Sequence, residues 1–469
     1  MQLMYKDTVV ADIQMKRGII WKIDHIYDMS MLPLGIYPAD YNFSIDAERN
    51  ADILDSWWRN NAIPTERDSI RKGLECIGIE TPEELKFLSH GVSLLNHYWI
   101  KEENENLQWR DLNYWDNAFS DEVGVALFNH KAVHSPLNML SSPDAGINGA
   151  LKKCWIKKQT VLNDTDYDAI CQKTNDKYRY YLKKSGTGSY RQEVYNEVFA
   201  SKLYEIIGIM HADYQLHNDP ADDDYTCISR CFTSDKTDFI PLFQLWDSVP
   251  YSYLHREKSA LSDYDKMLAV CEYYQIEDEQ SVKKYINDML CIDYILAQSD
   301  RHINNIGFIR DVTTKEITLS PIYDSGSCLW YDKSFSRPIN GIDDSVQEAK
   351  PFGGVPASGT WNKQIEYIND YVPLPKDKLM AATEEHFQAL LNVAKMPEDR
   401  VRLIAHFVLE RARRLQLHLM EKTPIEEMKY LDSKYVLSTK DVENFDPKSI
   451  QLVGTLNKMA IKNQTEIRS

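Results

Sequence analysis

The 469-residue chain lacks the features of membrane and secreted proteins. No run approaches the ~20 apolar residues that a membrane-spanning helix needs. The opening stretch, MQLMYKDTVVADIQMKRG, contains no signal-peptide apolar core. The eight cysteines include no CxxC pair, which disfavours a zinc site and favours buried free thiols in a reducing compartment. We therefore expect a cytoplasmic protein that makes no membrane contact.

The chain also lacks an excess of positive charge. It has 54 Lys and Arg against 71 Asp and Glu, a net charge of −17. This balance disfavours non-specific binding of the whole chain to nucleic acids or anionic membranes. We also find no internal repeat, low-complexity tract, helix-turn-helix or basic arm. What is present is a globular composition, 43% hydrophobic and 27% charged, long enough for two or three domains.

The first 125 residues read as an α/β subdomain. Alternating apolar residues predict three short strands, at Leu3–Tyr5, Val9–Ile13 and Ile19–Ile23. Residues 49–125 are predicted to be helical and are rich in aromatic side chains, including Trp57, Trp58, Tyr98 and Trp99. Aromatic residues mostly serve cores, so a packed helical subdomain is favoured over a recognition surface.

Residues 126–245 are predicted to be mainly β with one helix. The strands are expected within 141–158, 177–184 and 225–232. Glu193–Ile207 has the apolar spacing of an amphipathic helix, and Gly208 is its expected C-cap.

From about residue 250 the chain is predicted to be mostly helical. Ser281 is the expected cap of a helix that ends near Gln298, and Glu398–Glu421 is a second amphipathic helix. Residues 333–361 read as a long loop. The predicted fold is α+β with four parts: an N-terminal α/β subdomain 1–125, a β-rich lobe 126–245, a helical lobe 246–425 and a peripheral segment 426–469.

The chemistry concentrates in residues 293–327. Asp300, His302 and Asn305 crowd a short loop after a helix, and two strands are predicted at Ile306–Ile309 and Glu316–Ser320. Asp324 follows, with Gly326 two places on. A single Asp or Asn in a loop most often caps a helix or makes a turn. The combination is far less common, and we interpret it as a functional site.

This pattern suits magnesium–phosphate chemistry. Asp300 can accept a proton from a substrate hydroxyl or orient that hydroxyl. Asn305 and Asp324 offer hard oxygen ligands to Mg²⁺, which takes few protein ligands and leaves the rest to water and phosphate.

A β-rich lobe followed by a helical lobe is the layout of a two-lobed protein-kinase-like fold, which needs a cation to hold ATP phosphates. Lys183 is the candidate, since it lies at a strand end and the next helix carries Glu197, which would orient it. Lys184 is adjacent, and strand alternation alone does not decide between the two lysines.

Three segments carry a family resemblance. DRHINN (300–305) resembles the D-R-H-x-x-N loop of phosphatidylinositol 3-/4-kinases and the related loop of HipA-like serine/threonine kinases. PIYDSG (321–326) resembles the HipA-like P-x-Y-D metal segment. YYLKK with NEVFASKLYEIIGI (196–209) is similar to the HipA-like stretch that supplies the lysine and glutamate. The resemblance covers about residues 140–420.

The resemblance implies a role for each matched residue. Asp300 is the catalytic aspartate, and Asn305 and Asp324 bind Mg²⁺. Lys183 contacts the ATP phosphates and is supported by Glu197. The segment DAGINGALKK (144–153) lies over the phosphates and supplies Asn148, Gly149 and Lys153, although it lacks the G-x-G-x-x-G signature, as HipA-like kinases do. His302 braces the catalytic loop through hydrogen bonds. For Arg301, pairing with a phosphorylated residue, pairing with a carboxylate and solvation all stay open.

The implied function is an ATP- and Mg²⁺-dependent kinase that phosphorylates serine or threonine on a protein. HipA-like kinases often act as toxins beside a small DNA-binding antitoxin, so any DNA contact is expected from that partner and not from this chain. Two alternatives stay open: a small-molecule or phosphoinositide-type kinase, and a catalytically silent pseudokinase scaffold.

Overall fold

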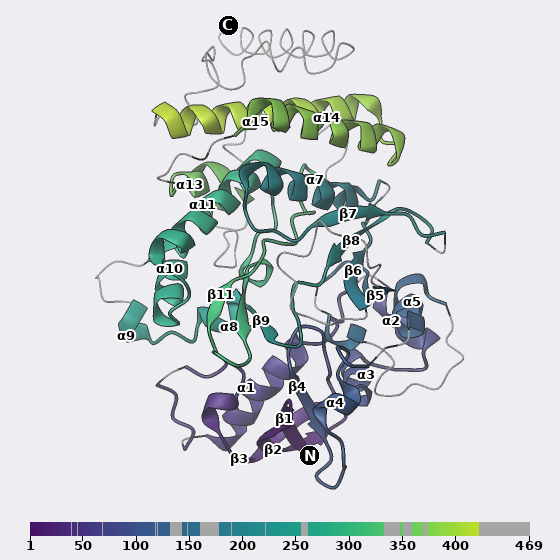
Figure 1. The fold of residues 1–469 in the computed structure, drawn as a ribbon, viewed down its shortest axis with the longest axis vertical. Helices are drawn as coiled ribbons and strands as arrows, with labels where there is room; N and C mark the ends of the chain where they lie inside the picture. The colour runs from purple at the N-terminus through teal and green to yellow at the C-terminus, as the bar shows by residue number, and fades with distance from the viewer. Residues whose placement is uncertain are drawn as a thin grey trace, which may run out of the picture.

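Figure 1 shows the computed structural model of the protein. It describes residues 1–421 except for 39, 45, 68, 118, 120, 132–142, 148, 160–177, 189, 221, 255–260, 333–347, 350–358, 369–371 and 373. Helices and sheets are mixed throughout this part of the chain, as the sequence predicts. No helix in it is both long and apolar enough to span a bilayer.

The N-terminal sheet has the order β3-β2-β1-β4, and every pair in it is antiparallel. Its strands are β1 (Gln2–Tyr5), β2 (Thr8–Lys16), β3 (Ile19–Ile26) and β4 (Tyr98–Lys101). The three predicted strands are confirmed. The prediction of helix was wrong at β4, because Trp99 and Ile100 pair across to β1 and their side chains enter two different buried clusters.

Residues 47–129 contain five described helices, drawn in purple and blue in Figure 1, and the first of them packs on β3. They are α1 (Ala47–Asn60), α2 (Ile70–Cys76), α3 (Pro82–Leu88), α4 (Trp109–Leu112) and α5 (Asp121–Asn129). A single 3₁₀ turn, Met29–Met31, follows β3. Trp57, Trp58 and Trp99 are all buried. The aromatic side chains therefore form a packed core, as predicted.

A second sheet has the order β5-β6-β8-β7. Its strands are β5 (Lys153–Gln159), β6 (Tyr178–Lys184), β7 (Tyr214–His217) and β8 (Thr226–Arg230), with a 3₁₀ turn at Pro143–Gly146 before β5. The helix α7 (Gln192–Ile207) connects β6 to β7. Gly208 ends α7 at a φ of 74°, in the left-handed region, so the predicted helix and its glycine cap are confirmed.

A third sheet, β11-β10-β9, contains the two strands that lie between the loop 300–305 and Asp324. It contains β9 (Thr237–Pro241), β10 (Gly307–Asp311) and β11 (Ile317–Leu319). The intervening helices are α8 (Leu242–Trp246), α9 (Tyr251–Leu254), α10 (Asp263–Tyr273) and α11 (Glu279–Leu296), then a 3₁₀ turn at Ile303–Asn305. The cap of α11 is Asp278, whose carboxylate accepts from the Ser281 amide at 3.0 Å, so the prediction of Ser281 as cap was wrong.

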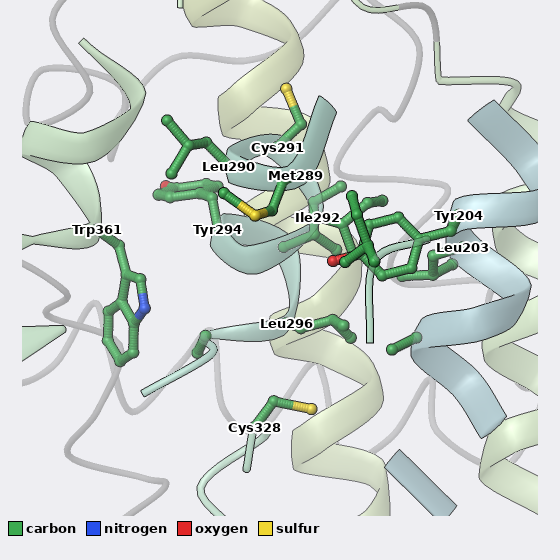
Figure 2. Close-up of a cluster of buried hydrophobic side chains, with 14 of the residues drawn as sticks. Leu203, Tyr204, Met289, Leu290, Cys291, Ile292, Tyr294, Leu296, Cys328 and Trp361 are labelled. Atoms are coloured by element: carbon green, nitrogen blue, oxygen red, sulfur yellow. The ribbon is translucent and has the colours of Figure 1, made fainter. Parts of the chain in front are cut away.

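The remaining elements lie within residues 348–421. They are β12 (Glu348–Ala349), β13 (Gly359–Thr360), α13 (Trp361–Ile365), α14 (Lys376–Asn392) and α15 (Glu398–Glu421). Most of the predicted loop 333–361 and all of segment 426–469 lie outside the described residues. A large apolar cluster joins α7, α11, α14 and α15, and Figure 2 shows part of it, with Tyr204, Leu296 and Trp361 among its members.

Candidate active site

The loop after α11 is held by its own backbone and side-chain contacts. The helix ends at Ala297, whose φ of 50° turns the chain sharply. The Asn305 amide nitrogen donates to the carbonyl of Asp300 at 3.0 Å. The amide of Asn304 donates to Nδ1 of His302 at 3.2 Å. The Asp300 carboxylate is one-third exposed and lies 3.9 Å from Nε2 of His302. The arrangement presents a carboxylate to solvent on a rigid loop.

Arg301 joins this loop to the segment that carries Asp324. Its guanidinium is buried and donates to both Asp293 oxygens at 2.9 and 3.0 Å. It also donates to the carbonyl of Tyr323 at 2.7 Å and to the hydroxyl of Ser325 at 2.8 Å. Burial opposes the charged form, but the Asp293 carboxylate holds the pKa of Arg301 above its ordinary value. Of the three open alternatives for Arg301, pairing with a carboxylate is the one the structure shows.

Asp324 lies among cations. Its backbone has a φ of 58°, and its Oδ1 accepts from Lys184 Nζ at 2.6 Å. Its Oδ2 lies 3.8 Å from Lys153 Nζ. Burial raises the pKa of Asp324, but Lys153 and Lys184 outweigh it and hold the pKa well below its ordinary value. The carboxylate is therefore ionised, and about a quarter of its side-chain surface is exposed.

The ion pair with Glu197 is made by Lys184. Lys184 Nζ donates to Glu197 Oε1, and Glu197 Oε2 accepts from the amide of Ser325 at 2.9 Å. Lys183 pairs instead with Asp222, at 2.6 Å. The predicted pair of Lys183 with Glu197 was therefore wrong. Successive residues of a strand point to opposite faces, and α7 covers the face of β6 to which Lys184 points.

The predicted phosphate-covering segment reaches the same place. Gly149 has a φ of 103°, and a Cβ built on it would lie 2.3 Å from Lys153 Nζ. Lys153 is buried, and the pKa of its ammonium is lowered to about 8 mainly by that burial. Asn148 lies outside the described residues. The structure thus brings Gly149 and Lys153 to Asp324.

Two buried polar residues were missed in the sequence. Gln298 accepts from the amide of Asp300 at 3.3 Å and donates to the carbonyl of Asp324 at 3.2 Å, so it bridges the two predicted acidic residues. Asn196 donates to the carbonyls of Gly326 and Cys328 at 3.1 and 2.8 Å. Both could have been found as amide side chains beside a motif, since Gln298 precedes D-R-H by two positions and Asn196 precedes Glu197.

Three aromatic rings cluster next to these groups. Phe232, Phe239 and Tyr323 are half-buried, with ring centroids 5.6 to 5.9 Å apart. Tyr323 adjoins Asp324 in sequence, and its hydroxyl donates to the carbonyl of Asn304 at 2.7 Å. The three rings therefore pack against one another, and Tyr323 joins them to the loop that carries Asp300.

The donor set suits a magnesium ion. Asp324 presents an ionised carboxylate, and Asn305, whose amide nitrogen donates to the Asp300 carbonyl, offers its amide oxygen as a second ligand. A carboxylate and an amide oxygen are typical of Mg²⁺ sites that share the ion with phosphates and water. Lys153 and Lys184 add the positive charge that a polyphosphate requires.

Comparison with known proteins supplies a family and one sequence relative. The profile of the HipA-like C-terminal domain family matches residues 145–411, more than half of the chain. The serine/threonine-protein kinase CtkA of Helicobacter pylori strain J99 is 38% identical over 66 residues, which are 14% of this chain and 20% of that protein. The chain thus matches only about a fifth of the length of this curated relative.

Two solved structures align with the chain. The proinflammatory kinase CtkA of Helicobacter pylori aligns with a TM-score of 0.41 and 15% identity, covering 52% of this chain and 92% of that one. A chain of the Shewanella oneidensis MR-1 toxin–antitoxin complex of HipA, HipB and operator DNA aligns with a TM-score of 0.41 and 10% identity. That alignment covers 97% of this chain and 96% of the other.

Proposed function

The chain belongs to the HipA-like C-terminal domain family, and we propose that it is a two-lobed, ATP- and Mg²⁺-dependent kinase that phosphorylates serine or threonine on a protein. The observation that carries this proposal is the contact of one buried lysine, Lys184, with both Glu197 and Asp324. A lysine oriented by a glutamate, next to an acidic metal ligand, is the arrangement that phosphoryl transfer from ATP requires.

Each residue takes a specific role in this proposal. Lys184, in place of Lys183, binds the ATP phosphates and is oriented by Glu197. Lys153, at the end of the segment 144–153, adds a second positive charge. Asp324 and Asn305 would hold Mg²⁺, which when bound neutralises the phosphate charge. Asp300 orients the acceptor hydroxyl and takes its proton, since its carboxylate is exposed on the loop.

The lysines also control how the metal ligand is used. Without nucleotide, Asp324 is neutralised by Lys184 at 2.6 Å and by Lys153 at 3.8 Å. When a polyphosphate is bound, it competes for both ammonium groups and frees the Asp324 carboxylate for a cation. Nucleotide and metal binding are therefore expected to be mutually dependent.

The cluster of aromatic rings is the proposed binding surface for the adenine base. The rings of Phe232, Phe239 and Tyr323 contact one another, and Tyr323 is the chain neighbour of Asp324, which is the basis for placing the purine against them. Stacking on aromatic rings tolerates any flat base, so we expect adenine to be held here largely by apolar contact.

The acceptor and partner are proposed from the family and the relative. CtkA is a serine/threonine-protein kinase, which favours a protein hydroxyl over an inositide or a small molecule. Membership of the HipA-like family is the basis for proposing a cytoplasmic toxin that works beside a small DNA-binding antitoxin.

Radiolabelled ATP and the purified full chain test the proposal. We expect Mg²⁺-dependent transfer of label to protein serine or threonine, and none to phosphoinositides or small-molecule alcohols. Transfer to either of those acceptors but not to protein would establish the alternative kinase class. Tight Mg-ATP binding with no transfer to any acceptor would instead indicate a pseudokinase scaffold.

A further inference from the structure

The loop that precedes β5 packs as part of the N-terminal subdomain. Ala145 is fully buried in a cluster otherwise made of apolar side chains from residues 63–127. At Gly146 a Cβ would lie 2.9 Å from the Ser93 hydroxyl oxygen, so that subdomain closely approaches the loop there. The Asp144 carboxylate accepts from the amide of Trp155 at 2.6 Å and ties the loop to β5. The loop is thus held between the N-terminal subdomain and the second sheet.

Arg67 makes the polar part of this junction. It lies between α1 and α2, and its side chain is buried. Its Nε donates to the carbonyl of Gly149 at 3.0 Å, and its Nη2 donates to the carbonyl of Ile147. A guanidinium has a rigid fork of donors, so a single side chain fixes two carbonyls two residues apart in a set geometry.

The two carbonyls that Arg67 binds belong to the segment that approaches Lys153. Gly149 adopts a left-handed φ of 103° and leaves no room for a side chain against Lys153 Nζ. Lys153 Nζ in turn lies 3.8 Å from Asp324.

We propose that Arg67 is a positioning residue of the nucleotide site: by fixing the carbonyls of Ile147 and Gly149, it holds Lys153 where the phosphates bind. The inference rests on the proposed function for its effect on nucleotide, but not for its effect on the loop. It makes the N-terminal subdomain a structural part of the site and gives Arg67 a role that its place in the aromatic region does not suggest.

Hydrogen exchange on the nucleotide-free full chain tests the loop directly. In Arg67→Ala, the amides of Ile147 and Trp155, which bond within this junction, should exchange at least about tenfold faster. Arg71→Ala is the matched control, because Arg71 lies four residues on, is highly exposed and forms an ion pair with Glu75 on its own helix. Unchanged exchange in Arg67→Ala, or equal change in the control, would overturn the proposal.

Titration calorimetry with Mg-ATP then tests the nucleotide site. We expect Arg67→Ala to weaken affinity by roughly 10- to 100-fold, the usual effect of misplacing a binding group. Arg67→Lys can donate to one carbonyl, so its Mg-ATP affinity should fall between those of the wild type and Arg67→Ala. Added methylguanidinium should restore part of the affinity that Arg67→Ala loses. Full affinity in Arg67→Ala contradicts the positioning role. A wild-type protein that binds no Mg-ATP contradicts the proposed function, while the exchange result still decides the loop contact.

Discussion

Lys184 is the residue on which the site depends most. It is buried with two carboxylates, and burial is the largest cause that raises the pKa of Glu197, ahead of the opposing effect of Lys184. Removing the ammonium leaves the buried Glu197 and the partly exposed Asp324 near each other with much less compensating charge. Removing one partner of such a buried network typically destabilises a protein by about 3–5 kcal/mol. The loss extends to function because the same ammonium is proposed to meet the phosphates.

The matched lysines of β6 provide the first prediction. Lys184→Ala should abolish transfer and lower the free energy of unfolding by about 3 kcal/mol. Lys183→Ala removes a different buried pair, with Asp222, and should leave Mg-ATP affinity within a few-fold of wild type. Calorimetric titration and urea unfolding of both variants measure the contrast. Equal loss of affinity in the two variants would return the phosphate role to the Lys183 side of the strand.

The two aspartates give the second prediction. Asp300 orients the acceptor hydroxyl and takes its proton in the proposed reaction but does not bind the nucleotide, so Asp300→Ala should keep Mg-ATP affinity within a few-fold while transfer falls by roughly 10²–10⁴. Asp324→Asn should lose both transfer and the Mg²⁺ dependence of nucleotide binding. Both quantities are measured on the same folded preparations. If Asp300→Ala lost nucleotide binding as severely as Asp324→Asn, Asp300 would have to be a metal ligand.

What the sequence reveals at this scale depends on how local the information is. The spacing of D-R-H-x-x-N and the later Asp-x-Gly predicts Asp300, Asn305 and Asp324 as a set, because the loop and hairpin are local structures. The choice between Lys183 and Lys184 is different, since it depends on which face of β6 receives α7. That is a tertiary fact, and alternation along one strand does not contain it.

At the scale of elements, α13 contacts the chain just before the loop that carries Asp300. The indole nitrogen of Trp361 donates to the carbonyl of Gln298 at 2.7 Å, and Gln298 bridges Asp300 and Asp324. The Arg411 guanidinium of α15 lies 4.9 Å from the Trp361 ring and 4.2 Å from that of Tyr294. Helix α15 therefore acts on the spacing of the two aspartates through Trp361.

Trp361→Phe is the third prediction. It keeps a ring against Arg411 but removes the donor to the Gln298 carbonyl, and we expect transfer to fall about tenfold with a stability loss of about 1 kcal/mol. Trp246→Phe, a buried tryptophan in α8, is the control and should lose stability without a comparable loss of transfer. Steady-state transfer rates and thermal unfolding measure both effects. An unchanged rate in Trp361→Phe would exclude this support.

The elements themselves were predictable where their signals are local. The helices α7 and α15 have long apolar periodicity, and Gly208 marks a stop, so both were predicted within a residue or so of their bounds. Strand β4 was missed because four residues, Tyr98–Lys101, carry too little pattern to outweigh a helical neighbourhood. Its conformation is fixed by pairing with β1, which lies almost 100 positions earlier.

At the scale of the whole molecule, α14 and α7 share one core. The His386 ring of α14 stacks on Phe199 of α7 at 4.3 Å, and α7 also carries Glu197. His386 is buried, and among the described residues its Nε2 has no hydrogen-bond partner. That burial lowers the pKa of His386 to about 3, so the ring is neutral in the folded protein over most of the acid range.

The fourth prediction follows from this histidine and concerns acid stability. The unfolded chain binds the proton with a pKa of about 6.5, whereas the folded protein resists protonation until about pH 3. Stability is therefore fully present above pH ~6.5 and falls by up to about 1.4 kcal/mol per pH unit as pH drops toward 3. His386→Phe keeps the stacked ring and removes the titration. Other groups titrate in both proteins, including the buried His406, whose pKa burial also lowers. The difference in unfolding free energy between wild type and variant, measured by urea unfolding at pH 7, 6 and 5, isolates His386. It should change in favour of the variant as pH falls, and a difference that stayed constant with pH would show that His386 is not held neutral by burial.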